Sequence, residues 1–464
     1  MKINPNSRKL TILILSGILI FGCKKDTNQS SVESVATTSE HSLSLSAVAA
    51  PSPLTYRNTF YNTDYLSVGV GGFKHTGSGS IEILGNFPLS SVTKVYLYWH
   101  GESPVVEEVG KTVKLNGTTV TGTNIGITGP NNGLDNGTSK EINSQAYRAD
   151  VTAIVKSSAT REFAVSEFGR LVADGASFVL FYSDGISSNN RDIVLFDGND
   201  SKKGFAGYPG NPKAPFDPAG WDFSLSGVNY TSGKVLVTMH VADGQSINEG
   251  DGPFFLNSQE IFSRWDANGS TVEGANTLFS ARWDIIPTDI TPWLQPGVNS
   301  LRVTINQLPN QDLLGLVVAL FNLPKGAAPV NTIPVSFDYR PLNCPNTLRT
   351  SSGAEEAAIL GSSTFNVNQV DLSSVKLNGI PFKKSRVIDK SAPFNGTVSS
   401  CSTCSTLAPD GIKDLEFLFD SQLLLKTLGM VKDKQCIKVT LTGKLLPQYG
   451  STPIKGEDYI LISK

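Results

Sequence analysis

A strand-like segment that occurs twice is the feature that most constrains the fold of this chain. Residues 94–101 read KVYLYWHG and residues 234–241 read KVLVTMHV, so His100 and His240 lie near the ends of matching segments. Similar landmarks follow in the same order, namely LNG, YRADVTAIV, REFAVSE and DGASFVLFYSDG after the first copy, and FLN, WDIIPTDITPWL, NSLRVTINQ and QDLLGLVVALFN after the second. Alternating apolar residues suit a pleated strand with one face on a core. The duplication therefore predicts two tandem β-sandwich units.

The composition supports an all-β protein and argues against a nucleic-acid partner. The 464 residues suffice for two or three domains, and the 43 Gly and 25 Pro residues indicate many turns. The formal net charge is −2 and only 17% of the residues are charged. Such a chain lacks the basic surface that neutralises phosphates, so we expect no nucleic acid among its partners.

The N-terminus has the pattern of an export signal. Basic residues precede an apolar run over residues 10–21, which is too short to span a bilayer comfortably. The ending LIFGC resembles the bacterial lipobox, in which the cysteine becomes the first residue of the mature chain and is lipidated. The resemblance implies a lipoprotein signal peptide over residues 1–22 and a lipid anchor on Cys23. An ordinary secretion signal with an incidental cysteine is the alternative.

The rest of the chain divides by composition. Residues 23–53 are rich in Ser, Thr and Ala without apolar periodicity, and we expect a flexible tether there. We place one β-sandwich unit at residues 54–226, a second at 227–331 and a smaller C-terminal module at 332–464. The Pro- and Gly-rich residues 202–220 are expected to join the first two units.

The segment at residues 289–303, DITPWLQPGVNSLRV, resembles one that recurs in galactose-binding-like jelly rolls. The matching positions are Asp289, Thr291, Leu294, Gly297, Asn299, Leu301 and Val303. The first unit keeps only Asp150, Thr152, Val155, Phe163 and Val165 of this pattern. The resemblance implies jelly-roll-like units, and it transfers no ligand residue.

The third module resembles a small β module at the C-termini of many bacterial secreted proteins. The matching motifs are VSFDYRP, NCPN, AAILG, PDGIKDLEFLFD and CIKVTLTG. The resemblance implies an accessory β-sandwich without a known activity. In that family a DxNGDG-like stretch looks like a calcium loop, of which Asp410 and Asp414 remain here. Because Ala408 and Pro409 stand where a further ligand is expected, a polar turn without metal is the favoured interpretation, and calcium bound by Asp410 and Asp414 is the alternative.

Four cysteines and a second acidic loop are further candidates for metal ligands. The third module contains Cys344, Cys401, Cys404 and Cys436, which in an exported protein predict two structural disulfides with three conceivable pairings. A zinc site or a redox CxxC pair is the alternative. A second calcium candidate lies in one loop after the repeated strand and comprises Asp243, Glu249 and Asp251. Calcium is the cofactor that these acidic loops suggest, and zinc would apply only to the alternative interpretation of the cysteines.

Aromatic side chains near strand ends could stack on sugars, whose faces are apolar and whose edges are polar. The ligand-binding candidates are Trp265, Tyr208, Trp221 and Trp99, together with His100 and His240. Trp99 lies in a patterned strand, where a core position is the alternative. The two histidines could hold a metal only if the two units faced each other, and strand-end positions with half-exposed rings are their alternative.

These features predict an envelope-anchored binding or adhesion protein, held to the membrane by its lipid and facing the periplasm or the cell surface. A polysaccharide or glycoprotein is the expected ligand. One alternative is a hydrolase of glycans or glycoproteins, because paired jelly rolls also build some such enzymes. Two carboxylates converging between the first two units would favour that alternative. Another alternative is a structural subunit of a surface assembly. The chain contains no GxSxG turn, and we name no catalytic residue.

Overall fold

The structure is a computed structural model that describes residues 52–103, 105, 107–128, 143–201, 220–242, 254–262, 283–305 and 314–464. The predicted signal peptide, Cys23 and most of the tether lie outside the described residues. The chain from Val48 to Lys464 forms one compact unit. Strands dominate it, so the predicted all-β fold is confirmed. No helix within the described ranges is long and apolar enough to cross a membrane.

The strands follow the duplication in the sequence. The first repeat contains β1 (Ser52–Gly71), α1 (Phe73–Thr76), β2 (Ser78–Glu82), η1 (Leu89–Ser91), β3 (Val92–Ser103), β4 (Thr112–Leu115), β5 (Thr118–Thr121), β6 (Thr123–Thr128), β7 (Asn143–Asp150), α2 (Thr152–Ser157), β8 (Glu162–Ser166) and β9 (Val172–Tyr182). The second repeat contains β10 (Arg191–Ser201), β11 (Asp222–Tyr230), β12 (Leu236–Ala242), β13 (Phe254–Leu256), β14 (Gln259–Phe262), β15 (Trp283–Asp289), η3 (Thr291–Trp293), β16 (Gly297–Ile305) and β17 (Gly315–Pro324).

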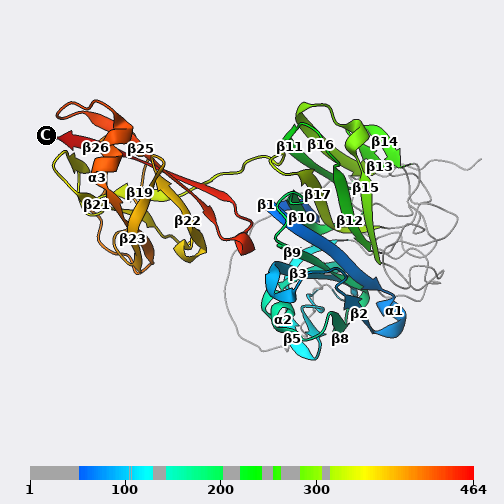
Figure 1. Cartoon of the computed structure of the whole chain (residues 1–464). Coiled ribbons are helices and arrows are strands. Elements are labelled where there is room, and N and C mark those ends of the chain that lie inside the picture. The colour runs from blue at the N-terminus through cyan, green and yellow to red at the C-terminus, as the bar shows by residue number, and fades with distance from the viewer. Residues whose placement is uncertain are drawn as a thin grey trace, which may run out of the picture. The chain divides into compact units, whose positions relative to one another are not determined.

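Sheet pairing repeats in the same way. One sheet has the order β15-β12-β17-β10-β1-β9-β3-β7-β6, so β10 pairs with β17 as β1 pairs with β9. The second layers have the matching orders β2-β8-β4-β5 and β11-β16-β13-β14. Each repeat is therefore a two-layer β-sandwich. Antiparallel pairing of β1 with β10, which lie side by side in Figure 1, joins the two.

The second repeat begins earlier than composition suggests. The segment that forms β10 falls within the predicted first unit, yet it pairs with β17 and contributes Val194 and Phe196 to the core of the second repeat. Trp221 lies in the same core. Because β10 occupies the place that β1 has in the first repeat, the second repeat starts near Arg191. The boundary between the repeats is therefore set by strand pairing, and it does not coincide with the Pro- and Gly-rich residues 202–220.

Strand alternation sorts the side chains of the shared sheet between different cores. On β3, Val95, Leu97 and Trp99 pack in the core of the first repeat. Tyr96 and Tyr98 project from the other face into a cluster that also includes residues of the second repeat. This face therefore carries the side chains that lie between the two repeats.

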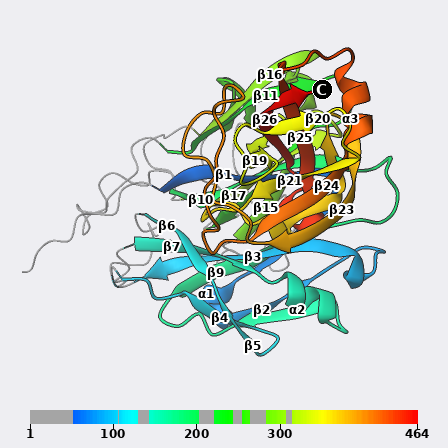
Figure 2. The same cartoon turned by 90° about the vertical axis from the view of Figure 1, so that its left-hand side faces the viewer.

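The third module has a core of its own. Its elements are β18 (Ile333–Pro334), β19 (Ser336–Tyr339), β20 (Thr347–Arg349), β21 (Ala354–Leu360), η4 (Val367–Gln369), β22 (Val370–Leu377), β23 (Ile380–Ile388), β24 (Asp414–Asp420), α3 (Ser421–Leu428), β25 (Cys436–Leu445), η5 (Pro447–Tyr449) and β26 (Pro453–Ser463). The strands have the order β18-β26-β25-β22-β23-β24-β21-β19, and Figure 2 shows β23 beside β24. Buried residues such as Phe337, Phe417 and Leu441 fill the space between its layers.

Candidate functional site

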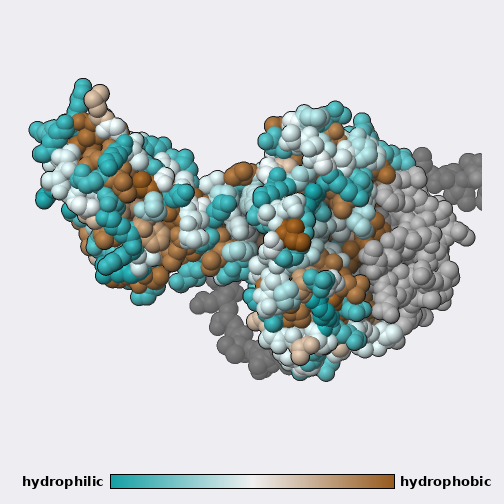
Figure 3. Space-filling view, viewed as in Figure 1, coloured by the Kyte–Doolittle hydropathy of each residue, from teal (hydrophilic) through white to brown (hydrophobic). Residues whose placement is uncertain are grey.

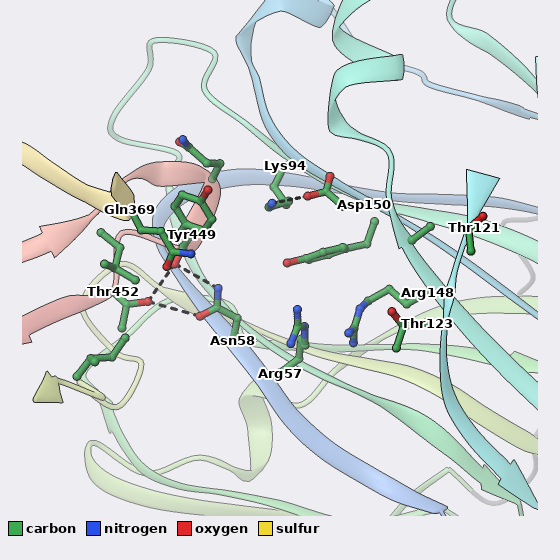
Figure 4. Close-up of a pocket in the computed structure, with 15 residues that line it drawn as sticks. Arg57, Asn58, Lys94, Thr121, Thr123, Arg148, Asp150, Gln369, Tyr449 and Thr452 are labelled. Atoms are coloured by element: carbon green, nitrogen blue, oxygen red, sulfur yellow. Dashed lines mark hydrogen bonds and ion pairs between the residues drawn. The ribbon is translucent and has the colours of Figure 1, made fainter. Parts of the chain in front are cut away.

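A polar pocket of about 520 Å³ lies where the first repeat meets the connection between β25 and β26 (Figure 4). Its polar and aromatic lining consists of Arg57, Asn58, Lys94, Tyr96, Thr121, Thr123, Arg148, Asp150, Gln369, Gln448, Tyr449 and Thr452. Three of these side chains are cationic, and one is a carboxylate. The pocket therefore combines positive charge, hydrogen-bonding groups and two aromatic rings.

Strand alternation and register place four of the lining residues on one face. Lys94 and Tyr96 are two positions apart on β3, as are Arg148 and Asp150 on β7, so each pair projects to the same side. In the antiparallel pairing of these strands Tyr96 lies opposite Asp150. Cross-strand neighbours on one face are close enough to interact. The four side chains consequently form one continuous wall of the pocket.

Arg57 reaches the pocket because β1 is irregular at this point. Its neighbours Tyr56 and Asn58 pair with Phe196 and Leu195, which are consecutive residues of β10, so Arg57 is the extra residue of a bulge. A bulge leaves one residue outside the ladder and turns its side chain in a new direction. The Arg57 side chain is exposed and directed at the Tyr96 ring.

One aromatic ring has three cations around it. The guanidinium carbons of Arg57 and Arg148 lie 5.9 and 5.8 Å from the centre of the Tyr96 ring, and Lys94 Nζ lies 5.5 Å from it. Lys94 Nζ is also 5.4 Å from the centre of the Tyr449 ring. Attraction between a cation and the electron-rich face of a ring helps hold like charges close together.

Two of the three cations already have a carboxylate partner. Lys94 donates a hydrogen bond of 2.7 Å to Asp150, and Arg148 forms an ion pair with the buried Asp197. Burial alone would raise the pKa of Asp150, but hydrogen bonds from Lys94 and Thr152 outweigh it and lower the pKa below its ordinary value. Asp150 is therefore charged at neutral pH and neutralises Lys94 locally.

Arg57 differs from the other two cations. Among the residues that the structure describes, no carboxylate forms an ion pair with it, and its contact with Tyr96 leaves the guanidinium charge uncompensated. Guanidinium groups present paired N–H donors that match the two oxygens of a carboxylate or sulfate. The pocket thus has a surplus positive charge suited to an anionic group.

A turn of the third module closes one side of the pocket. Gly450, which follows η5, accepts a hydrogen bond of 3.1 Å from the backbone of Tyr61. Asn58 donates to the Tyr449 carbonyl at 3.3 Å and accepts from the Thr452 hydroxyl at 3.4 Å, as Figure 4 shows. These bonds between β1 and the turn position Tyr449 beside the cations.

At the positions that the structure describes, the second repeat lacks some of the residues that form this pocket in the first repeat. By strand register, Leu236 of β12 lies opposite Asp289 as Tyr96 lies opposite Asp150. Pro287 similarly occupies the position of Arg148. The difference between the two copies is a sequence signal that could have identified the site, because Tyr96 and Arg148 stand where the second repeat has the apolar residues Leu236 and Pro287, while the lysine and the aspartate of this face occur in both repeats.

The tryptophans that the sequence suggested as sugar-stacking residues lie in cores where the structure describes them. Trp99 and Trp221 are fully buried, in the first and second repeats respectively. Alternation along β3 turns Trp99 toward the core of the first repeat, and Trp221, which directly precedes β11, packs into the core of the second repeat. Trp265 and Tyr208 lie outside the described residues.

His100 and His240 are both fully buried rather than half exposed, which corrects the strand-end alternative. His100 Nδ1 lies 2.6 Å from a carboxylate oxygen of Asp174, and His240 Nδ1 lies 2.7 Å from the hydroxyl of Ser177. Both partners belong to β9, so the two repeats do approach each other at these histidines. Burial lowers the pKa of His240 to about 3, which keeps its imidazole neutral.

The acids proposed as calcium ligands are not brought together as a site. Asp414 is buried and accepts backbone N–H groups from Gly361, Lys390 and Ser391, at 2.8, 2.7 and 3.1 Å. Asp410 is exposed and accepts the N–H of Ile412 in a local turn. Within the described ranges no group of three or more His, Cys, Asp or Glu side chains could hold a metal ion. The second candidate set, Asp243, Glu249 and Asp251, lies outside the described residues.

The four cysteines form two disulfides, so that prediction is confirmed and the zinc and CxxC alternatives do not apply. Cys344 pairs with Cys404, and Cys401 pairs with Cys436. The two cysteines of the CxxC motif thus have separate partners. Together the bonds attach residues 401–404 to the segment before β20 and to the start of β25.

No protein-family model matches this chain, and no curated protein sequence matches it.

Proposed function

We propose that the protein is a lipid-anchored binding protein of the cell envelope that recognises an anionic carbohydrate in the pocket around Arg57, Lys94 and Arg148. The observation that carries the proposal is the unbalanced charge of Arg57, placed beside two other cations and the rings of Tyr96 and Tyr449. Aromatic rings suit the apolar faces of sugars, while guanidinium groups suit their carboxylate or sulfate substituents.

The size and shape of the pocket agree with a ligand of one or two sugar rings. Its volume of about 520 Å³ lies within the range of small-molecule sites, about 300–1,000 Å³. Asn58, Gln369, Gln448 and Thr452 supply amide and hydroxyl groups around the cations. Such groups can both donate and accept hydrogen bonds, as sugar hydroxyls require.

Binding is favoured over hydrolysis at this pocket. A glycosidase uses two carboxyl groups on opposite sides of the scissile bond. Among the described lining residues Asp150 is the single carboxylate, and it is engaged by Lys94 and Thr152. The buried acids Glu102 and Asp174 are fully enclosed and do not line the pocket.

A purely structural role receives less support from the surface. On the face shown in Figure 3, apolar residues are interspersed with hydrophilic ones. Among the large exposed apolar side chains, Leu84 follows β2 of the first repeat, Val298 lies in β16 of the second repeat and Met430 follows α3 of the third module. A subunit that assembles through an apolar face would concentrate such residues in one patch.

The test is retention of the full chain on immobilised polysaccharides. Alginate presents carboxylates, chondroitin sulfate presents both carboxylates and sulfates, and dextran serves as the neutral control. We expect retention on at least one anionic polymer, none on dextran, and weaker binding as salt rises, because ion pairing at an exposed guanidinium is screened. Arg57→Ala should weaken binding at least tenfold, whereas Arg302→Ala, which removes an exposed arginine paired with Asp222, should have no effect.

Three results would contradict the proposal. Equal retention on dextran would show that the anionic group is not recognised, and wild-type binding by Arg57→Ala would place the ligand elsewhere. Release of shortened polysaccharide, detected by mass spectrometry of the eluate, would favour the hydrolase.

A further inference from the structure

A second cavity, of about 320 Å³, lies within the third module and is lined by two buried carboxylates. Asp338 belongs to β19 and Asp458 to β26, and Asn346 precedes β20. The three residues are 6%, 3% and 1% exposed, respectively. Since all three line the same cavity, their polar groups face a space that a small ligand or ion could occupy.

The hydrogen bonds of the two carboxylates are unequal. Asp458 accepts the backbone N–H groups of Tyr339 and Tyr459, each at 2.7 Å, and the amide of Asn346 at 2.8 Å. For Asp338, the described hydrogen bond is from the same amide at 3.3 Å. Among the described residues neither acid forms an ion pair with a lysine or arginine. Buried charges in proteins are normally paired or bound to a metal ion. If both carboxylates are ionised, the described residues supply no positive charge to balance them.

Asn346 gives a second and independent indication. Its side-chain nitrogen lies between the two carboxylates, while its oxygen is buried without a hydrogen-bond partner in the described part of the chain. A rotation of 180° about the last side-chain bond exchanges the two atoms with little change in shape. The amide oxygen would then lie about as far from the two carboxylate oxygens as the nitrogen does, at 2.8 and 3.3 Å.

Such separations are typical of oxygens that share one cation. Ligands at about 2.3–2.6 Å from a calcium ion, spaced around it in six- to eight-fold coordination, lie roughly 3 Å from one another. The unequal spacing suits calcium, which tolerates irregular geometry, better than magnesium, which requires a nearly ideal octahedron. An all-oxygen ligand set also disfavours zinc, which usually takes nitrogen and sulfur ligands.

We infer that Asp338, Asn346 and Asp458 bind a calcium ion in the third module, with the Asn346 amide rotated and water completing the coordination. The site links the start of the module to its last strand, because Asp338 and Asp458 belong to β19 and β26. Cys404, bonded to Cys344, lines the same cavity and holds the segment around Asn346 in place. Affinity should be that of extracellular calcium modules, with a Kd of about 10⁻⁴–10⁻³ M.

The competing way to remove the charge is a proton. Burial, together with the charge of Asp458, raises the pKa of Asp338 to about 7. A protonated Asp338 could share its hydrogen with Asn346 or Asp458 and need no metal. The experiment must therefore separate calcium binding from protonation.

The test is calorimetric and thermal titration of the full chain with calcium chloride at pH 7.5, after treatment with chelator and buffer exchange. We expect one ion bound per chain and a rise in Tm, because a ligand that binds only the folded state stabilises it. Asp338→Asn should weaken calcium binding at least tenfold with little loss of fold, since its one described hydrogen bond is long. Asp410→Asn, at the exposed acid of the suggested calcium loop, should bind as the wild type does.

A third variant tests the role of the amide. Asn346→Asp adds a carboxylate of the same shape, so it should lower the Tm in chelator and strengthen calcium binding. No calcium-dependent heat or Tm change in the wild type would overturn the inference in favour of a shared proton. Wild-type affinity in Asp338→Asn, or loss of binding in Asp410→Asn alone, would also overturn it.

Discussion

Lys94 and Asp150 form an ion pair of 2.7 Å that the second repeat reproduces, at 3.7 Å, between Lys234 and Asp289. The duplicated pairs differ in their surroundings. The Lys94 side chain is 8% exposed and lies near the rings of Tyr96 and Tyr449, whereas the Lys234 side chain is 64% exposed. The same Lys–Asp ion pair thus occurs in both repeats, but among the described residues it lines a pocket only in the first.

Replacement of these lysines should therefore have unequal effects. Lys94→Met should lower the free energy of unfolding by about 1–2 kcal/mol, because it removes the cation that two rings and Asp150 surround. Lys234→Met should change it by about 0.5 kcal/mol or less, as is usual for an exposed ion pair. Urea unfolding of both variants provides the comparison, and equal losses would show that the surroundings of Lys94 add nothing.

The turn after this ion pair should behave alike in both repeats. The hydroxyl oxygen of Thr152 accepts a hydrogen bond of 2.9 Å from the backbone N–H of Val95, and that of Thr291 accepts one of 2.8 Å from the backbone N–H of Val235. Thr152→Val and Thr291→Val keep the shape of the side chain and leave these N–H groups without an acceptor. Each should lower the free energy of unfolding by about 1–3 kcal/mol, measured in urea. Loss in one repeat alone would contradict their equivalence.

Gly450 should be required for the contact between the third module and β1. Its φ of 86° suits glycine, and a Cβ atom there would lie 2.3 Å from the Thr59 carbonyl oxygen. Gly450→Ala should therefore displace the turn beside Tyr449 and weaken ligand binding in the pocket. Gly379→Ala is the matched control, since Gly379 has a φ of 85° and nothing within 4 Å of the added carbon. Equal effects on binding to anionic polysaccharide would mean that only backbone conformation matters.

His240 should make the fold sensitive to acid. Its folded-state pKa of about 3 is below the ordinary value of 6.5 because burial disfavours the charged ring. The stability that depends on neutral His240 is fully present above about pH 6.5 and is lost as the pH falls toward 3. Between pH 7 and 5 this residue should account for a loss of about 2 kcal/mol, at about 1.4 kcal/mol per pH unit below the unfolded pKa. Urea unfolding at both pH values should show a smaller loss for His240→Gln, and an unchanged pH dependence would exclude the role of this histidine.

Much of the local structure was determined by the sequence. The alternation of Val95, Leu97 and Trp99 with Tyr96 and Tyr98 predicts a strand with two different faces, because successive side chains project to opposite sides. The duplication predicts two similar sandwiches, and four cysteines in a chain that begins with the pattern of an export signal predict disulfides. These features depend on residues close in sequence or on the compartment, so they could be read without the fold.

The tertiary structure alone decided which distant residues meet. The pairing of β1 with β10 moves the boundary of the second repeat, and a bulge at Arg57 turns that residue toward Tyr96. In the third module, Asp338 and Asp458 lie beside Asn346 because strands far apart in the sequence pack together. The alternation of apolar and polar residues in the sequence indicates which face of a strand a side chain occupies. It does not indicate the partner or the register of a strand, because these are determined by the packing of whole sheets. Both proposed sites depend on the strand partners and registers that the tertiary structure establishes.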